Sequence, residues 1–231
     1  MTKIYKNIFF DLDRTLWDFE TNSKETLNEL FYKYKLNSKI EKFDEFFDVY
    51  EKINEKYWDL YRKGKISKEY LRTNRFNSTL KFFDINDFKL SEKFGIDYIK
   101  ISPQKNNLFA GTIDILEYLY TKYNLYIITN GFKEVQFIKL RNSNLDKYFK
   151  KVFTSEMVGV QKPNSKFFEY AIKHTNSRKT ESIVVGDDLK VDILGAKNFG
   201  IDQIYFNPKR KKHNQNINFE INNLIEIKNI L

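Results

Sequence analysis

Cysteine is absent from this chain of 231 residues, and histidine occurs only twice. The first absence excludes disulfides, thiolate chemistry and zinc sites built on cysteine. With only His174 and His213 available, a Ser-His-Asp triad or a histidine-rich metal site has little material. No apolar run approaches the length of about 18 residues that a membrane span needs, and no signal-like segment precedes the first apolar stretch. We therefore expect a cytoplasmic protein without a membrane partner.

Arginine is also scarce, since it supplies only seven of the 40 basic residues. The net charge of +9 invites a nucleic-acid interpretation. However, the lysines are spread along the chain, and arginine is the preferred residue for bidentate contacts to phosphates and bases. The one dense basic cluster, at 209–212, follows Pro208 within a polar stretch (207–218) that we expect to form a loop. We expect no nucleic-acid partner, and a basic nucleic-acid-binding module remains as the non-enzyme alternative.

Glycine is nearly missing from residues 18–104, where only Gly64 and Gly95 occur. Apolar residues in this region follow helical spacing, first over 27–34 and then over 43–61. Ser67 is a candidate N-cap for another helix. The pattern predicts a helical insertion over residues 18–104.

Helices and strands alternate from about residue 105 onward. The predicted helices cover 112–122, 132–143, 164–175 and 190–199, and the predicted strands cover 125–129, 151–154, 182–187 and 202–206. Such alternation indicates a parallel sheet with helices on both faces, which a first strand over 6–11 must join. The predicted fold class is therefore α/β: a Rossmann-like three-layer core from residues 1–17 and 105–231, with the helical insertion as a second domain.

Two aspartates, Asp11 and Asp13, stand at the carboxyl end of the first predicted strand. Because strand side chains alternate between faces, both leave the chain on the same side, at the sheet edge where open α/β folds bind ligands. Paired carboxylates there suggest a metal site and a carboxylate nucleophile. Taken alone, the pair fits equally well a strand that ends in polar turn residues.

Three later segments repeat this arrangement of an apolar run followed by polar residues. Leu125–Ile128 leads into Thr129-Asn130-Gly131, Val158–Val160 precedes Gln161-Lys162-Pro163, and Ser182–Val185 leads into Gly186-Asp187-Asp188 with Asp192 further on. In this order, the four segments resemble the motifs of the haloacid dehalogenase-like (HAD) superfamily. The resemblance covers nearly the whole chain, and it identifies the helical insertion as a type 1 cap domain.

The resemblance implies a role for each motif residue. Asp11 would be the nucleophile that forms an aspartyl-phosphate, and Asp13 the general acid and base. Thr129, with the backbone N–H groups of Asn130 and Gly131, would bind the phosphoryl group, and Lys162 would neutralise it. Mg²⁺ would be held by Asp11, the backbone carbonyl of Asp13 and Asp187. The sequence leaves open whether Asp188 or Asp192 supports the metal.

Arg14 departs from the family pattern, because most members carry glycine at this position. The backbone there must accept a long side chain, and the guanidinium is expected to face the cap or a neighbouring acid. The presence of Asp13 argues against dehalogenation, since a halide leaves without a proton. We therefore expect phosphatase chemistry.

The chain also resembles the branch of the superfamily that contains pyrimidine 5′-nucleotidases, through the run Asp11–Trp17 and an aromatic, basic cap segment. The candidate specificity residues are Trp17, Phe19, Trp58, Arg62, Lys63 and Lys65. We expect a Mg²⁺-dependent hydrolase of a small phosphorylated metabolite, most simply a pyrimidine nucleoside 5′-monophosphate. Sugar-phosphate or phosphoglycolate-type phosphatases are the first alternative, and a phosphomutase is the second. The sequence carries no signal of oligomeric state.

Overall fold

The computed structural model describes residues 4–231, which divide into two compact units. One unit comprises the residues up to 19 together with 106–231, and the other comprises residues 20–105. We call them the core unit and the helical unit. Their limits lie within two residues of the domain boundaries expected from the sequence.

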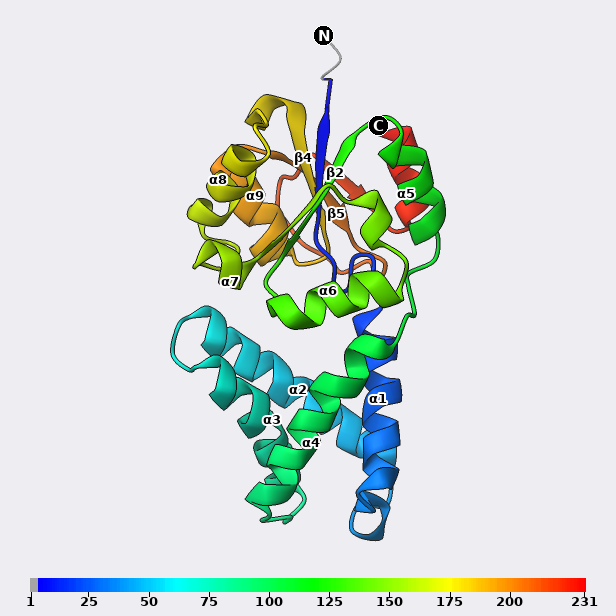
Figure 1. The fold of residues 1–231 in the computed structure, drawn as a ribbon, viewed down its shortest axis with the longest axis vertical. Coiled ribbons are helices and arrows are strands. Elements are labelled where there is room, and N and C mark those ends of the chain that lie inside the picture. Colours follow the sequence, from blue (N-terminus) through cyan, green and yellow to red (C-terminus); the bar gives the residue numbers. More distant parts are fainter. Residues whose placement is uncertain (1–3) are drawn as a thin grey trace. The chain divides into compact units, whose positions relative to one another are not determined.

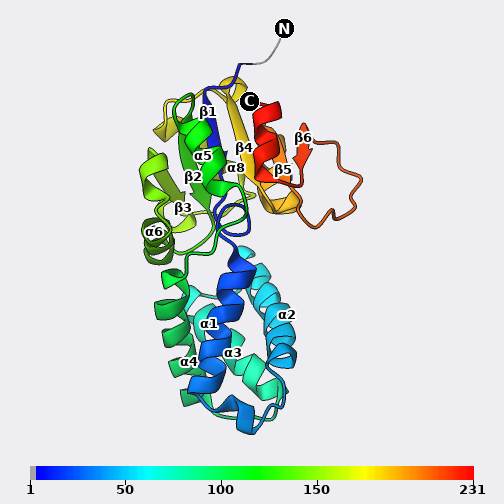
Figure 2. The ribbon, with the colours of Figure 1, turned by 90° about the vertical axis from the view of Figure 1, so that its right-hand side faces the viewer.

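The core unit is built on a parallel sheet, which has six strands within residues 4–231 (Figure 2). Its order is β3-β2-β1-β4-β5-β6, and every neighbouring pair is parallel. The strands are β1 (Asn7–Phe10), β2 (Asn124–Thr129), β3 (Lys151–Thr154), β4 (Ser182–Gly186), β5 (Asp202–Phe206) and β6 (Phe219–Ile221). Since β1 pairs with both β2 and β4, the segments that follow these three strands meet at one edge of the sheet.

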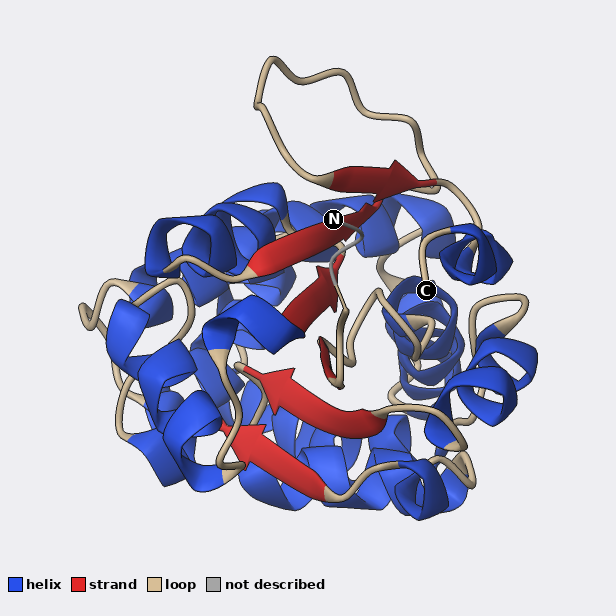
Figure 3. Cartoon of the chain, turned by 90° about the horizontal axis from the view of Figure 1, so that it is seen from above, coloured by secondary structure: helices blue, strands red, loops and turns tan. Residues whose placement is uncertain are grey.

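Alternating side chains of β1 enter two different hydrophobic clusters. Ile8 and Phe10 pack in the cluster that includes residues of α5 (Thr112–Tyr120), whereas Phe9 packs in the cluster of α8 (Ser165–His174) and α9 (Leu194–Phe199). Helices therefore cover both faces of the sheet, as Figure 3 shows. The core unit also contains the α-helices α6 (Lys133–Asn142) and α7 (Ser155–Val158). The predicted three-layer α/β architecture is confirmed.

Three local features of the structure were not predicted. The run Val158–Val160 is not a strand: α7 ends there, and Gly159 adopts a left-handed conformation with φ of 82°. The helix expected over 190–199 begins with a π-helical turn, Leu189–Ile193, before α9. Beyond the irregular stretch 207–218, the chain returns as β6 and a 3₁₀ helix, Leu224–Asn229, whose Leu224 and Ile227 are fully buried.

The helical unit contains α1 (Phe19–Lys33), α2 (Phe43–Arg62), α3 (Lys68–Phe82) and α4 (Phe88–Ile101), which Figure 1 labels. Buried aromatic and aliphatic side chains from these helices form its own core. Ser67 caps α3 as predicted, by accepting a hydrogen bond from the backbone N–H of Tyr70 at 3.1 Å. Helix α4 was not predicted from the spacing of apolar residues. None of the helices between residues 4 and 231 combines the length and hydropathy that a membrane crossing requires.

Candidate active site

Asp11 lies directly after β1, and its side chain is fixed on both carboxylate oxygens. Oδ1 accepts a hydrogen bond from Lys162 Nζ at 2.8 Å, and Oδ2 accepts one from Thr15 Oγ1 at 3.3 Å. The backbone N–H of Asp11 donates to the carbonyl of Val185 at 2.8 Å, which continues the β1–β4 pairing by one residue. The residue is 7% exposed. The predicted nucleophile is therefore a buried carboxylate held in one orientation beside a cation.

Lys162 is the buried cation of this site, at 1% exposure. Its Nζ donates to Asp11 Oδ1 at 2.8 Å, Asp192 Oδ1 at 2.6 Å and the Ile128 carbonyl at 2.7 Å. Burial alone would lower the pKa of Lys162, but the two carboxylates raise it above its usual range, so the side chain stays charged. A lysine with three acceptors in the interior differs from the usual exposed lysine.

The side chain of Asn130 holds Lys162 in place through the lysine backbone. Its Nδ2 donates to the Lys162 carbonyl, and its Oδ1 accepts from the Lys162 N–H, both at 2.9 Å. Its own carbonyl accepts a hydrogen bond from Ser155 Oγ at 3.1 Å. The sequence drew attention only to the backbone of Asn130, so this clamp between the segments after β2 and β3 is a finding of the structure.

Three carboxylates lie close together at the carboxyl ends of β1 and β4. Oxygen atoms of Asp11, Asp187 and Asp192 lie within 4.8 Å of one another, and Thr15 Oγ1 donates to Asp187 Oδ1 at 3.3 Å. Asp192 comes this close because residue 186 is glycine: a Cβ there would lie 2.6 Å from the Asp192 side chain. The sequence thus brings together three acidic groups, of which Asp11 and Asp192 are buried and Asp187 is half-buried.

Burial is the main cause of the perturbed acidity in this cluster. It raises the pKa of Asp11 to about 7, although Lys162 opposes the shift, and it raises the pKa of Asp187 well above the ordinary value. The pKa of Asp192 is raised as well, for the same first reason. One lysine therefore does not balance the three carboxylates. A hard divalent cation with oxygen ligands, such as Mg²⁺, fits this donor set.

Asp188 and Asp192 have different surroundings. Asp188 Oδ1 accepts hydrogen bonds from the backbone N–H groups of Lys190 at 2.9 Å and Val191 at 3.0 Å, so it caps the turn that leads into α9. Asp192 Oδ2 accepts from the N–H of Asp188 at 3.2 Å, while Oδ1 contacts Lys162. Of these two residues, Asp192 is the one within the acidic cluster.

Asp13 is held by two side chains that the sequence did not single out. Gln136 Nε2 donates to its Oδ2 at 2.7 Å, and Lys139 Nζ donates to its Oδ1 at 2.5 Å. Both donors come from α6 and are buried, whereas the Asp13 side chain keeps 22% of its surface exposed. The signal in the sequence was their spacing of three residues, which places them on one face of a helix.

Thr129 is the last residue of β2, and Gly131 lies in the turn that follows. Thr129 is 1% exposed, and its Oγ1 accepts a hydrogen bond from the Gly131 N–H at 3.0 Å. The hydroxyl proton of Thr129 remains a donor for an anion. The four motif segments therefore converge at the sheet edge as expected.

Trp17 and Phe19 are two of the aromatic candidates for substrate specificity, a role that would need an exposed ring face. Trp17 is instead fully buried in the hydrophobic cluster of the core unit, with Lys139 Nζ 3.9 Å from its ring centroid. Because its faces are covered, it offers no platform for a base. Phe19 is partly buried and carries the Arg14 guanidinium 4.5 Å from its ring centroid.

The other specificity candidates belong to the helical unit. Trp58 is half-buried and packs edge-on against Tyr61, with ring centroids 5.8 Å apart. Arg62 ends α2, and Lys63 and Lys65 are exposed in the turn that follows. Lys63 also pairs with Asp59 at 2.7 Å. These side chains have the exposure that a substrate contact needs.

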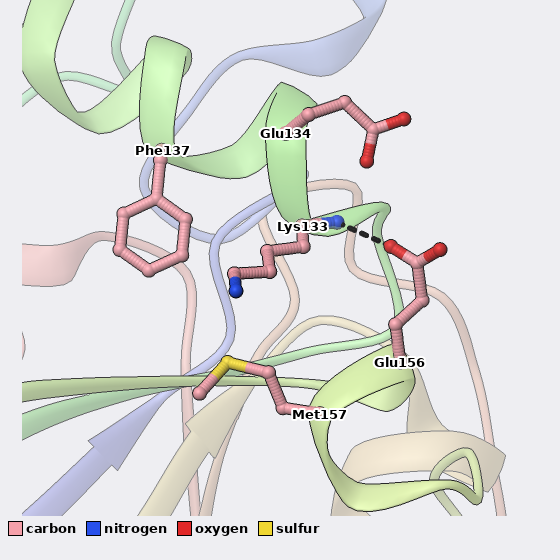
Figure 4. A pocket seen from close by; sticks show the side chains of 5 residues that line it. All are labelled: Lys133, Glu134, Phe137, Glu156 and Met157. Carbon is pink, nitrogen blue, oxygen red and sulfur yellow. Dashed lines mark hydrogen bonds between the residues drawn. The ribbon is translucent and has the colours of Figure 1, made fainter.

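A shallow pocket of about 430 Å³ lies on the core unit, between the starts of α6 and α7 (Figure 4). Its lining residues are Lys133, Glu134, Phe137, Glu156 and Met157, and the Lys133 N–H donates to Glu156 Oε2 at 2.7 Å. Phe137 and Met157 are about 40% exposed. None of the acidic cluster lines this pocket, so the chemistry described above does not take place in it.

Comparisons with known proteins agree with this geometry. A profile of haloacid dehalogenase-like hydrolases matches residues 8–206. The Mg²⁺-bound crystal structure of the HAD-hydrolase YfnB from Bacillus subtilis superposes with a TM-score of 0.90, at 28% identity and 99% coverage of both chains. The pyrimidine 5′-nucleotidase YjjG of Escherichia coli is 30% identical over 97% of this chain and 96% of its own length. A glyceraldehyde 3-phosphate phosphatase of Methanothermobacter thermautotrophicus is 30% identical over 87% of this chain and 85% of its own.

The profile match runs from β1 to β5 and therefore includes all three residues of the acidic cluster. The similarity to YfnB and YjjG extends over nearly the full chain. The site residues predicted from the sequence lie within that span. The chain belongs to the haloacid dehalogenase-like hydrolase family.

Proposed function

We propose that this hydrolase is a Mg²⁺-dependent phosphatase that transfers the phosphoryl group of a pyrimidine nucleoside 5′-monophosphate first to Asp11 and then to water. The observation that carries the proposal is a pair of carboxylates held in different ways after β1. Asp11 is buried against Lys162 and Thr15, whereas Asp13 is partly exposed and held from α6. The first arrangement suits a nucleophile, and the second suits a group that exchanges protons with substrate and water.

In the first step, a carboxylate oxygen of Asp11 forms a bond to phosphorus while the bond from phosphorus to the nucleoside oxygen breaks. Asp13 gives its proton to that departing oxygen, so an alcohol rather than an alkoxide leaves. Lys162, whose Nζ is 2.8 Å from Asp11 Oδ1, supplies positive charge beside the nucleophile. The Thr129 hydroxyl, with the backbone N–H of Asn130, would donate to the phosphoryl oxygens.

In the second step, water attacks phosphorus and the bond from phosphorus to Asp11 breaks. Asp13, now ionised, takes a proton from the attacking water, which returns both aspartates to their starting states. Bound to Asp11, Asp187 and the Asp13 carbonyl, with Asp192 adjacent, Mg²⁺ would offset the repulsion between carboxylate and phosphate.

The choice of a pyrimidine nucleotide rests on similarity to YjjG, which covers a larger share of this chain than does the glyceraldehyde 3-phosphate phosphatase. The chemical core treats phosphomonoesters alike, so discrimination must come from contacts to the leaving group. Trp58, Arg62, Lys63 and Lys65 are the candidates in the helical unit. Stacking a base on an aromatic side chain is worth about 1–3 kcal/mol, or roughly a tenfold to hundredfold preference.

The test measures kcat/KM for phosphate release from UMP and dTMP against AMP, glyceraldehyde 3-phosphate, phosphoglycolate and glucose phosphates. Each substrate is assayed with Mg²⁺ and with EDTA. We expect UMP or dTMP to lead by about tenfold or more and EDTA to abolish release. The control is Asp11→Asn, which keeps the side-chain volume and removes the nucleophile, so it should be folded and inactive.

Three outcomes would contradict parts of the proposal. A sugar phosphate or phosphoglycolate in the lead would leave a phosphatase but remove the nucleotide assignment. Transfer of phosphate within a hexose phosphate, without release, would indicate a phosphomutase. No phosphate release from any ester, or a folded Asp11→Asn variant with normal turnover, would reject the hydrolytic mechanism itself.

A further inference from the structure

Both carboxylate oxygens of Asp13 are taken by donors from a single helix. Gln136 Nε2 lies 2.7 Å from Oδ2, and Lys139 Nζ lies 2.5 Å from Oδ1. The two residues are three apart on α6, so they project from the same face, one turn from each other. A carboxylate bound on both oxygens has one fixed plane, whereas a singly bound carboxylate can rotate about its last torsion.

The cationic end of Lys139 is itself held on two sides. Its Nζ lies 3.9 Å from the ring centroid of Trp17 and 2.5 Å from Asp13 Oδ1. Trp17 is fully buried and Lys139 is 3% exposed. An ammonium group between a ring face and a carboxylate has little freedom, and desolvation strengthens both attractions. Lys139 therefore gives Asp13 a rigid support rather than a flexible surface partner.

The position of Gln136 is maintained against a stability cost. Its Oε1 is buried and has no hydrogen-bond partner among residues 4–231. Its side chain also requires glycine at position 131, because a Cβ there would lie 1.6 Å from Nε2. An apolar side chain would avoid the unsatisfied amide oxygen. An unsatisfied buried polar atom in a native protein needs an explanation, and for Gln136 the hydrogen bond from Nε2 to Asp13 supplies one.

We propose that Gln136 and Lys139 are positioning residues, which aim the Asp13 carboxyl group at the oxygen of the leaving group. This inference rests on the proposed phosphatase function, in which Asp13 protonates that oxygen. Both residues act through the Asp13 carboxyl group, to which they donate hydrogen bonds. Their effect is to keep one Asp13 oxygen in line with the leaving group, where a freely rotating carboxyl group would spend only part of its time.

A purely structural role for the same contacts is the competing explanation, since they also tie α6 to the segment after β1. The two explanations differ in how the loss depends on the leaving group. A good leaving group departs from phosphorus as a stable anion, so its departure does not depend on how Asp13 is oriented. A nucleoside leaves as an alcohol and must receive a proton from a correctly oriented Asp13. A general loosening of the site would slow all esters alike.

The experiment measures kcat/KM for a series from 4-nitrophenyl phosphate through phenyl phosphate to UMP. This parameter reports the steps up to departure of the leaving group. The variants are Gln136→Met, which keeps the volume and removes the unsatisfied oxygen, and Lys139→Met, with Lys139→Arg as the conservative form. The matched control is Lys133→Met, which removes an exposed lysine from the same helix.

We expect Gln136→Met and Lys139→Met to lose less than about threefold on 4-nitrophenyl phosphate and about thirtyfold or more on UMP. Lys139→Arg should recover most of the loss, and Lys133→Met should match the wild type throughout. Should Lys139→Met fail to fold, Gln136→Met alone decides the question. A loss of equal size across the series, or no loss on UMP in folded Gln136→Met, overturns the positioning role while the wild-type phosphatase activity still stands. A wild type that releases no phosphate from any ester overturns both proposals.

Discussion

The carboxamide of Gln136 occupies the space that a side chain on residue 131 would need. A Cβ on Gly131 would lie 1.6 Å from Gln136 Nε2 and 2.5 Å from its Cδ. Gly131 is not among the glycines with positive φ, so alanine would meet no backbone strain there. The three nearest atoms, Nε2, Cδ and Cγ, all belong to the Gln136 side chain. Gly131 thus serves the Asp13 support as well as the turn that follows β2.

Replacing Gly131 with alanine should therefore move Gln136 away from Asp13 without unfolding the core unit. We expect kcat/KM for UMP to fall about tenfold, with a small change in melting temperature. The loss should be strongly non-additive with Gln136→Met, because both changes remove the same contact. A double variant whose loss equals the product of the single losses would show that Gly131 acts through something other than Gln136.

The acidic cluster should make the metal-free protein less stable as the pH rises from about 4 to 7. In this range the unfolded state has released the proton of Asp11, whereas burial raises the pKa of the folded carboxyl from 3.8 to about 7. The folded state then binds more protons than the unfolded state, so the free energy of unfolding falls with increasing pH. Mg²⁺ binds the ionised carboxylates and should reverse the loss. Melting temperature at about pH 5 and about pH 8, with EDTA or Mg²⁺, measures both effects.

Asp187→Asn separates the two effects. Removing one of the three carboxylates relieves repulsion, so the metal-free variant should melt above the metal-free wild type at about pH 8. The rise should be several degrees if the relief is about 1–2 kcal/mol. The same change removes a metal ligand, so Mg²⁺ should raise its melting temperature much less. An Asp187→Asn protein that is less stable than wild type in EDTA and still gains normally from Mg²⁺ would contradict both expectations.

Asp188 should affect stability rather than Mg²⁺ affinity, because its Oδ1 caps the turn before α9 through two backbone N–H groups. Asp188→Ala should cost about 1 kcal/mol of unfolding free energy, as for other lost N-caps, and change the half-saturating Mg²⁺ concentration by less than about threefold. Asp188→Asn keeps the cap and is the control. Asp187→Ala, in comparison, should raise the Mg²⁺ requirement by about tenfold or more. If Asp188→Asn raises it as much as Asp187→Ala does, Asp188 belongs to the metal site.

The sequence predicted those site residues whose place at the end of a strand is enough to bring them together. Asp11, Thr129 and Asp187 all follow apolar strands, and the carboxyl ends of neighbouring parallel strands meet at one edge. Strand limits were close for the same reason, since buried parallel strands are continuous apolar runs. β6 was missed because it is only three residues long and follows a polar stretch without an apolar run.

The sequence did not predict how the side chains divide their roles within the site. On α6, Gln136 and Lys139 are buried, whereas Phe137 is 40% and Ile138 is 37% exposed, so the usual rule for apolar and polar residues is reversed. The carboxylate of Asp13 and the ring of Trp17, both supplied by a distant segment, account for the burial of Lys139. The difference between Asp188 and Asp192 likewise depends on the π-helical turn, which no spacing rule predicts.

Arg14 gives the last prediction, because its backbone adopts the conformation for which glycine is the ordinary choice. Its φ is 69°, in the left-handed region, which costs a residue with a Cβ about 1–2 kcal/mol relative to glycine. Its guanidinium stacks on the Phe19 ring at 4.5 Å, which offsets part of that cost. Arg14→Ala loses the stacking and keeps the strain, whereas Arg14→Gly loses the stacking and relieves it. We therefore expect Arg14→Gly to be more stable than Arg14→Ala by about 1 kcal/mol in urea unfolding, with identical loss of charge in the two variants. Equal stability of the pair would show that the left-handed backbone at residue 14 is not a source of strain.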